Sequence, residues 1–396
     1  MKVLVSGAGI AGLTSAFWLT HYGFDVTVIE RAPEIRDEGY MVDFYGEGVQ
    51  IAKAMGILEK LYALSANLKT VDIVNNNSKI VGSMKISDIQ KAMTDSNSGY
   101  MPLMRGHLER TIYEALPDQV KFHFATTITH IDNSPDAAKV TFSNGDTEEF
   151  DIVIGAEGIH STTRTLIFGE EEKFKVSMDA QVAIVRLAGA ANGNINVAKT
   201  NMAIGNFLAT VPTKNGDLIA VFAYNSTAPT PRNHDDALAM LRKIYSPQKQ
   251  FTNNIINQIT DDTYIYIDEV AQIRMPKWCE NRVALVGDAS ACLTLLSGQG
   301  SLMAMAESYI LARELSLAKG DYKTAFKNYE KNLMPTIAQK AIDSAKVTIL
   351  IPKNWLSYQM FKLIFRFMKF PMVQKMVFKQ YMKPTIFDQG YPLENA

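Results

Sequence analysis

Glycines near the amino end of the chain predict a binding site for the phosphates of a dinucleotide. Gly7, Gly9 and Gly12 stand at the GxGxxG spacing, and the residues after them read as a helix that Gly23 stops. Such glycines permit a tight turn and a close approach of backbone to pyrophosphate, and the helix start offers free N–H groups. Glu30 follows Gly12 by about 18 residues, where a carboxylate accepts hydrogen bonds from an adenosine ribose.

A second motif far along the chain indicates that the same cofactor is held twice. The apolar strand 283–286 ends in Gly287 and Asp288, and Gly298-Gln-Gly300 then opens a helix. Asp288 ends its strand where open α/β sheets bind ligands, so its carboxylate would accept a hydrogen bond from a cofactor hydroxyl. A nicotinamide cofactor that leaves in every turnover rarely needs such a second contact, whereas a resident flavin does. An ordinary helix start capped by Ser297 is the alternative.

The elements that must position these motifs alternate between strand and helix. Apolar runs at 2–6, 25–30 and 150–154 predict strands of a parallel sheet, and the apolar spacing over 46–64 predicts one helix. From about 174 to 274 the pattern is mostly β, which predicts a second domain inserted into the first. The predicted boundaries are 1–68, 100–172 and 274–340 for the cofactor domain, 69–99 and 173–273 for the β-rich substrate domain, and 341–396 for a C-terminal helical cap.

Composition fits a large enzyme of two domains. The 396 residues are 47% hydrophobic and carry a net charge of −1, which gives no indication of nucleic-acid binding. Two cysteines form no disulfide framework and favour a cytoplasmic location. We expect no signal peptide, because the first apolar run is the fingerprint strand, and no membrane span, because no apolar run reaches about 18 residues. The six histidines show no metal-ligand spacing, so no metal is expected.

A third motif, Gly155-Ala-Glu157-Gly158-Ile-His-Ser-Thr-Thr-Arg164, completes a resemblance to a known family. Over about residues 1–340 the chain resembles the FAD-dependent aromatic hydroxylases of the para-hydroxybenzoate hydroxylase type, which are single-component flavoprotein monooxygenases. Within them it is similar to the subgroup of tetracycline-inactivating monooxygenases. The resemblance implies an α/β fold with a Rossmann-like, glutathione-reductase-like FAD-binding domain, an inserted mostly-β substrate domain and a C-terminal helical cap.

The resemblance also implies the cofactor site. It assigns Arg105 to the flavin and ribityl region, Arg36 to the FAD phosphates, and the helix start at Gly300 to the pyrimidine edge of the flavin. Arg164, unless it is a plain surface cation, is expected to contact FAD or the nicotinamide phosphate. The residues expected to bind FAD are Gly7, Gly9, Ile10, Ala11, Gly12, Glu30, Arg31, Arg36, Arg105, Glu157, Gly158, Arg164, Gly287, Asp288, Ser297, Gly298, Gln299 and Gly300.

Three positions depart from the family pattern. Glu157 stands where the family usually has Asp, Ala291 where many relatives have His, and Thr294-Leu295 where prolines are common before Gly-Gln-Gly. The last two changes fall in the loop that faces the isoalloxazine in relatives. They bear on the efficiency of hydroxylation rather than on flavin binding.

The implied reaction is carried by the flavin, so no protein side chain is assigned as a catalyst. NADH or NADPH would reduce FAD and bind only transiently, and O2 would be captured as a C4a-hydroperoxide. Its oxygen would pass to an aromatic or polycyclic small molecule, a tetracycline-type antibiotic being one specific version. A flavin-dependent reductase or dehydrogenase of a lipid-like substrate, and a non-catalytic flavin-bound sensor, are the alternative functions.

Other candidate residues have simpler interpretations. His107 and His160 are expected to make local hydrogen bonds, and Cys292 to be a small buried thiol. The stretch 344–387 holds eight Lys and Arg, no acid, and many aromatic and Met residues. It is interpreted as a helical cap over the domain interface, and an amphipathic segment on a membrane surface is the alternative. The chain is expected to be a monomer.

Overall fold

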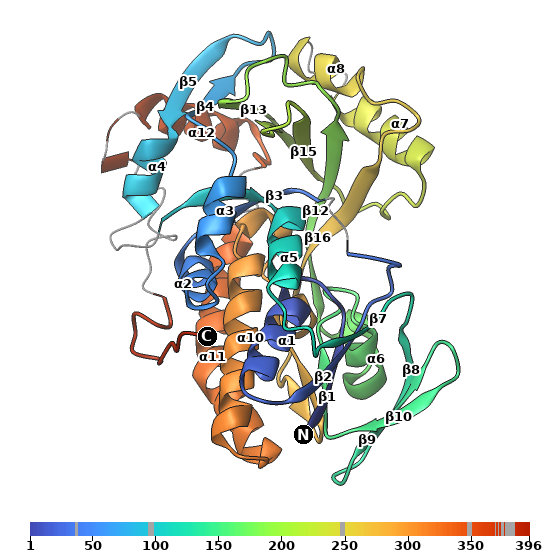
Figure 1. The fold of residues 1–396 in the computed structure, drawn as a ribbon. Coiled ribbons are helices and arrows are strands. Elements are labelled where there is room, and N and C mark those ends of the chain that lie inside the picture. The colour runs from blue at the N-terminus through green and yellow to red at the C-terminus, as the bar shows by residue number, and fades with distance from the viewer. Residues whose placement is uncertain are drawn as a thin grey trace.

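The computed structural model is built from two large sheets with helices packed around them (Figure 1). It describes residues 1–35, 39–93, 99–245, 250–346, 351–368, 370, 372–373, 376 and 385–396. Arg36 lies outside these residues, so its contact with FAD phosphates stays a prediction.

A six-stranded sheet of order β17-β18-β11-β1-β2-β7 carries the glycine motifs. Strand β1 lies centrally and pairs in parallel with both β2 and β11. Val3, Leu4 and Val5 are fully buried, because Val3 and Val5 pack in the core that contains helix α1 while Leu4 packs against a small three-stranded sheet. The strands are β1 (Lys2–Ser6), β2 (Asp25–Ile29), β7 (Lys121–His123), β11 (Ile152–Gly155), β17 (Cys279–Glu280) and β18 (Val283–Leu285), and the three-stranded sheet is β8 (Ile128–Asn133), β9 (Ala138–Phe142) and β10 (Thr147–Phe150).

Helices connect and cover this sheet, and two of them begin at the glycine motifs. Helix α1 follows the first motif and packs along α10, which begins at Gly300 as the sequence predicts and ends at Leu317. These helices and the paired strands nearby are α1 (Ile10–His21), β3 (Met41–Phe44), β6 (Met101–Met104), α5 (Arg105–Glu114), α6 (Thr162–Phe168), α9 (Asp288–Ala291), the short 3-10 turn η3 (Leu295–Ser297), α10 (Gly300–Leu317) and α11 (Tyr322–Ala345).

The single helix predicted over 46–64 is wrong: two helices occupy this stretch. Helix α2 (Gly46–Ala54) ends before Gly56, and α3 (Leu58–Leu64) begins after it. Gly56 has φ +73°, in the left-handed region that ends helices. The apolar spacing continues across the break because residues of both helices, among them Ile51 and Leu61, pack in the same core.

A seven-stranded sheet of order β16-β12-β15-β14-β13-β4-β5 forms the second layer. In β12, Ala183 and Val185 face a core that α7 and α8 complete, while Val182 and Ile184 face the opposite way, toward β6. Every second side chain of this sheet therefore points toward the junction with the six-stranded sheet. Its elements are β4 (Thr70–Val74), β5 (Ile80–Lys85), α4 (Ile86–Met93), η1 (Glu171–Lys173), β12 (Lys175–Leu187), β13 (Val197–Ala203), β14 (Asn206–Pro212), β15 (Leu218–Asn225), α7 (His234–Tyr245), α8 (Gln250–Ile256) and β16 (Ile265–Ile273).

The sheet takes its strands from 70–85 and 175–273, and the predicted domain boundaries themselves stay a prediction. Helix α12 (Trp355–Phe367) lies against β5, at the edge of the seven-stranded sheet (Figure 1). Within the part of the chain that the structure describes, no helix has the length and apolarity that a bilayer crossing requires.

Candidate active site

A cavity of about 520 Å³ lies where the three sequence motifs meet. Its walls come from the turn after β1, the end of β2, the loop after β11, the loop before α10 and the inner side of the seven-stranded sheet. The predicted cofactor residues on its wall are Gly7, Gly9, Ile10, Ala11, Glu30, Arg31, Arg105, Glu157, Gly158, Asp288, Gly298 and Gly300. The described residues contain no group of His, Cys, Asp or Glu arranged to hold a metal ion.

Glu30 is held at the edge of the first glycine turn. Its two carboxylate oxygens accept hydrogen bonds from the backbone N–H groups of Ala8 and Ala32, both at 2.8 Å. The carboxylate therefore bridges the turn after β1 and the loop after β2. This places it on the cavity wall with lone pairs left to accept further hydrogen bonds, as a ribose-binding acid requires.

Glu157 joins the third motif to the first. Its carboxylate accepts hydrogen bonds from the hydroxyls of Ser6 at 2.8 Å, Ser161 at 2.6 Å and Thr163 at 2.5 Å, and from the Thr163 N–H at 3.2 Å. The longer side chain, in place of the family's Asp, therefore reaches the first turn of α6, where a negative charge is favourable. Glu157 also lines the cavity.

Arg164 is neither a surface cation nor a residue of the cavity wall. Its side chain is fully buried, and its guanidinium donates to the carbonyl oxygens of Ala289 at 3.2 Å and Ile159, and to Glu171 at 2.9 Å. Burial lowers the pKa of this guanidinium, and the charge of Glu171 opposes that shift. Arg164 thus fixes the loop after β11 against α9. Its expected contact with FAD or the nicotinamide phosphate stays a prediction.

Gly12, Gly287, Ser297 and Gln299 also lie off the cavity wall. Gly12 and Gly287 are positions of close packing, since a Cβ on Gly287 would approach Ala11 Cβ to 2.9 Å. Ser297 donates its hydroxyl to the Thr294 carbonyl at 2.8 Å. These four residues shape the backbone that carries the wall residues.

Asp288 and Arg105 stand at the inner end of the cavity. Asp288 Oδ1 would lie 3.6 Å from a Cβ on Gly300, so its carboxylate is at the start of α10. Burial raises the pKa of Asp288, and the nearby positive charge of Arg105 opposes this. Arg105 forms an ion pair with Glu109 at 2.7 Å and lies 5.9 Å from the centre of the Tyr40 ring.

The loop from Leu293 to Gly298 is held in a strained form by distant elements. Thr294 has φ +113°, which is rare for a β-branched residue. The carbonyl of Leu293 accepts hydrogen bonds from the Gln272 side-chain amide at 3.0 Å and from the Ser344 hydroxyl at 2.6 Å. Gln272 is fully buried and its amide also lies 2.8 Å from the Ala341 carbonyl. Strands of the β-rich sheet and α11 therefore fix this loop together.

Sequence reasoning missed a buried carboxyl group beneath the second motif. Glu307 of α10 is fully buried, and one of its oxygens accepts from the Gly287 N–H at 2.7 Å and the Ser290 hydroxyl at 2.6 Å. Burial raises its pKa to about 8. In the sequence, Glu307 is the one acidic residue of the apolar run 302–311, and it belongs to no recognised motif.

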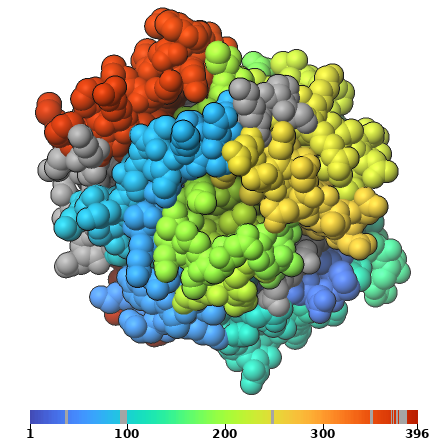
Figure 2. Space-filling model, turned by 90° about the horizontal axis from the view of Figure 1, so that it is seen from above, coloured from blue at the N-terminus to red at the C-terminus, as the bar shows by residue number. Residues whose placement is uncertain are grey.

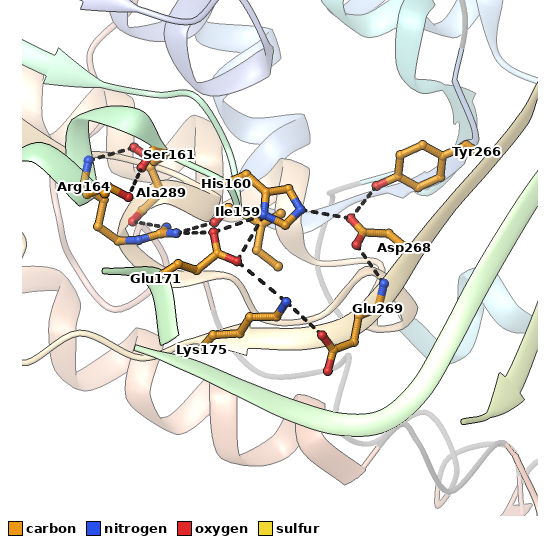
Figure 3. A network of polar contacts seen from close by, with 11 residues as sticks. Ile159, His160, Ser161, Arg164, Glu171, Lys175, Tyr266, Asp268, Glu269 and Ala289 are labelled. Atoms are coloured by element: carbon orange, nitrogen blue, oxygen red, sulfur yellow. Dashed lines mark hydrogen bonds and ion pairs between the residues drawn. The ribbon is translucent and has the colours of Figure 1, made fainter. Parts of the chain in front are cut away.

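The sequence did not indicate a polar network that includes His160, Asp268 and Glu269 of the cavity wall (Figure 3). His160 Nδ1 lies 3.1 Å from both oxygens of Glu171, and its Nε2 lies 3.7 Å from Asp268 of β16. Lys175 pairs with Glu269 at 2.8 Å and with Glu171 at 3.6 Å. The predicted local role of His160 is thus extended: it joins the loop after β11 to the β-rich sheet.

A family model described as an FAD binding domain matches residues 1–343. The chain belongs to this family. It is 30% identical over 336 residues to a flavin-dependent monooxygenase of Legionella longbeachae, covering 83% of this chain and 84% of the relative. We therefore describe it as an FAD-dependent monooxygenase.

Solved structures agree with this assignment. The tetracycline destructase Tet(51) superposes with a TM-score of 0.77 at 27% identity, covering 95% of this chain and 97% of the other. Klebsiella pneumoniae HpxO, solved with FAD and uric acid, superposes with a TM-score of 0.79 at 20% identity, covering 96% and 97%. The second likeness supports the fold of the monooxygenase alone.

The cavity of the monooxygenase fits FAD. At Gly9, a Cβ would lie 3.5 Å from Glu109 Oε1 and 3.6 Å from the Arg105 guanidinium, and both of these side chains line the cavity. Gly9 therefore presents its backbone to the cavity where a pyrophosphate would lie. One continuous cavity joins Glu30, at the ribose position, to Asp288 and the glycines that begin α10. Hydrogen-bond acceptors for hydroxyl groups and bare N–H groups for phosphates thus occur in the order that FAD presents them.

Replacing Glu30 with alanine should weaken FAD binding by about 10- to 100-fold, because a charge-assisted hydrogen bond to the ribose and both backbone anchors are lost. Titration of the apoprotein with FAD, followed by flavin fluorescence, measures the change. Asp25→Ala is the matched control, since among the described residues this exposed carboxylate pairs with Lys121 alone. Equal affinities in the two variants would remove Glu30 from the cofactor site.

Asp268→Asn should lower the pKa of His160 in the monooxygenase. The pairing with Asp268 and the charge of Glu171 raise that pKa above 6.5, while burial opposes them. The charged pairing is therefore complete below pH 6.5 and is lost as the pH rises through the raised value. NMR titration of the His160 ring, assigned with His160→Gln, measures the shift. Asp235→Asn, beside His234, should leave His160 unchanged, and an unchanged pKa in Asp268→Asn would contradict the pairing.

Proposed function

We propose that this monooxygenase consumes NADH or NADPH and O2 to hydroxylate an aromatic or polycyclic small molecule. The observation that carries the proposal is the second half of the cavity, which extends from Asp288 to the β-rich sheet. Tyr40, Val182, Tyr266 and Leu295 line it there with aromatic and apolar side chains. A flat, electron-rich ring system is the ligand that such walls accept.

The protein contributes binding, orientation and exclusion of water. When bound, FAD would supply the redox chemistry, accepting two electrons from the nicotinamide and passing them to O2. Glu30 and Asp288 would hold its hydroxyl groups, and the N–H groups at Gly298 and Gly300 would favour negative charge on the ring. The loop through Cys292 and Thr294 is buried and lines the cavity, where it would exclude water.

The likeness to Tet(51) supports a tetracycline-type compound as one specific substrate. The departures at Ala291 and Thr294-Leu295 lie beside the substrate half of the cavity, so we propose that they change the shape of the pocket. Residues 69–99 and 173–273 are proposed as the substrate domain. Two free cysteines support a cytoplasmic location, and we propose that the chain acts as a monomer.

The test is NADH and NADPH oxidation by the purified FAD-loaded protein with a panel of phenols, quinones and tetracyclines under ¹⁸O2. We expect one compound to raise the oxidation rate and to give a product carrying one ¹⁸O atom. Faster oxidation with a reduced product and no ¹⁸O would identify a reductase instead. No oxidation with any compound, despite a yellow protein, would identify a flavin-bound sensor.

A further inference from the structure

We propose that helix α12 is a docking surface for an anionic lipid bilayer, an inference that goes beyond the proposed reaction. Five large apolar side chains of this helix are exposed to solvent. Their exposed fractions are Trp355 66%, Leu356 64%, Met360 56%, Leu363 57% and Phe367 42%. An apolar helix side of this size is costly to leave in water and marks an interaction surface.

The exposed side chains share one side of the helix. At 3.6 residues per turn they fall within an arc of about 140°. Phe361 and Met368 lie on the opposite side and are buried, so α12 uses a different face to pack on the protein. A capping box stabilises the N-terminus of the helix: the side chains of Asn354 and Ser357 each accept a hydrogen bond from the backbone N–H of the other residue. The apolar arc therefore belongs to a stable helix and takes no part in packing that helix onto the protein.

The position of α12 leaves this arc accessible. The helix packs against β5, the edge strand of the seven-stranded sheet, and Figure 2 shows it in orange-red at the margin of the molecule beside the blue of β5. Ile80 and Val81 of β5 are themselves 61% and 57% exposed.

Charge decides which partner fits. Lys362 and Arg366 are exposed at one border of the apolar arc, within about 20° of Trp355 on the helix surface. The sequence from 344 to 387 contains no Asp or Glu and eight cations, which are Lys346, Lys353, Lys362, Arg366, Lys369, Lys375, Lys379 and Lys383. A second copy docking symmetrically through this arc would bring like charges together. An anionic bilayer instead accepts the apolar side chains and attracts the cations.

Trp355 provides a direct reporter. The chain has three tryptophans, and Trp18 and Trp278 are buried at 0% and 2% exposure. Transfer of Trp355 into the lipid interface should therefore dominate any change in emission. The experiment uses the full FAD-loaded chain and vesicles of phosphatidylcholine with 30% phosphatidylglycerol, compared with pure phosphatidylcholine. Flotation measures binding, and a shift of the emission to shorter wavelength places Trp355 in the bilayer.

We expect binding to the anionic vesicles that falls at least about tenfold with pure phosphatidylcholine, and that also falls in high salt. Leu356→Glu with Leu363→Glu should reduce binding by at least about tenfold. The matched control, Leu317→Glu with Ile342→Glu, adds the same charge at two side chains that are each 55% exposed elsewhere, and should bind as wild type.

Three outcomes would overturn the proposal. One is no flotation of the wild type with anionic vesicles. Another is equal loss in the double variant and its control, which would show a general effect of charge. The third is a concentration-dependent dimer in the absence of vesicles that Leu356→Glu with Leu363→Glu abolishes, which would make a second copy the partner. Because none of these readouts requires turnover, failure of the proposed reaction leaves the test intact.

Discussion

Gly12→Ala is expected to abolish FAD binding and to destabilise the whole cofactor domain. A Cβ at this position would lie 1.8 Å from the carbonyl oxygen of Gly7 and 3.3 Å from Val5 Cγ1. The Gly7 carbonyl cannot move without separating α1 from β1, which is the contact that forms the phosphate turn. The expected result is an insoluble or colourless protein, with FAD affinity lowered by at least about 100-fold. Thermal unfolding and the visible spectrum of the purified variant measure both effects.

Gly9→Ala separates folding from cofactor binding. A Cβ there would meet no protein atom closer than 3.5 Å, but it would point into the cavity. The apoprotein should therefore unfold at the wild-type temperature while binding FAD at least about tenfold more weakly. If Gly9→Ala bound FAD normally, the pyrophosphate would not lie at this turn. If Gly12→Ala were stable and yellow, the close packing of α1 on β1 would be wrong.

Glu307→Met is expected to destabilise the protein by about 2 to 5 kcal/mol. It fills the same space but leaves the buried N–H of Gly287 without its acceptor, while the Ser290 hydroxyl keeps only the Gly287 carbonyl at 2.8 Å. The turn that carries Asp288 would lose its anchor, so FAD affinity should fall by about tenfold as well. Denaturant unfolding and FAD titration measure the two effects, and a variant as stable as the wild type would contradict an anchoring role.

Glu307→Gln keeps an acceptor and removes the ionisable group. Burial raises the pKa of Glu307 from 4.5 to about 8, so the folded protein retains a proton that the unfolded chain releases. Wild-type stability should therefore fall as the pH rises from 4.5 to 8 and stay reduced above it. The glutamine variant lacks this loss and should gain a few kcal/mol on the wild type between pH 5 and pH 8. Parallel stability curves over that range would show that Glu307 does not titrate there.

The cofactor cavity was predictable from sequence because its walls are local motifs. Gly7 and Gly9 of the first motif, Gly158 of the third and Asp288 of the second each sit where a strand ends, and parallel strands end at the same edge of a sheet. The acid Glu30 was predictable from its spacing alone. The bounds of α10 followed from Gly300 and the apolar run after it.

What the sequence could not predict depends on contacts between distant residues. Arg164 stands in a motif, but its partner Ala289 lies 125 residues away, so burial of the cation was not visible. Asp268 gave no signal because its partner His160 comes from the other sheet. The break at Gly56 has the opposite explanation. A glycine often ends a helix, but the apolar pattern runs through both helices and indicates a single one.

Gln272 limits how this protein can be divided and recombined. Its one buried amide lies within hydrogen-bonding distance of the Leu293 carbonyl, the Ala341 carbonyl and the Ser344 hydroxyl. The β-rich sheet, the loop before α10 and the end of α11 therefore share a single polar group, although they are separate in sequence. A chimera that exchanges the β-rich segment with that of a relative must carry a matching loop and a matching α11, because otherwise the exchange leaves this amide unpaired in the interior. We therefore expect that transfer of the β-rich segment changes the substrate range only when the loop before α10 and the end of α11 are exchanged with it.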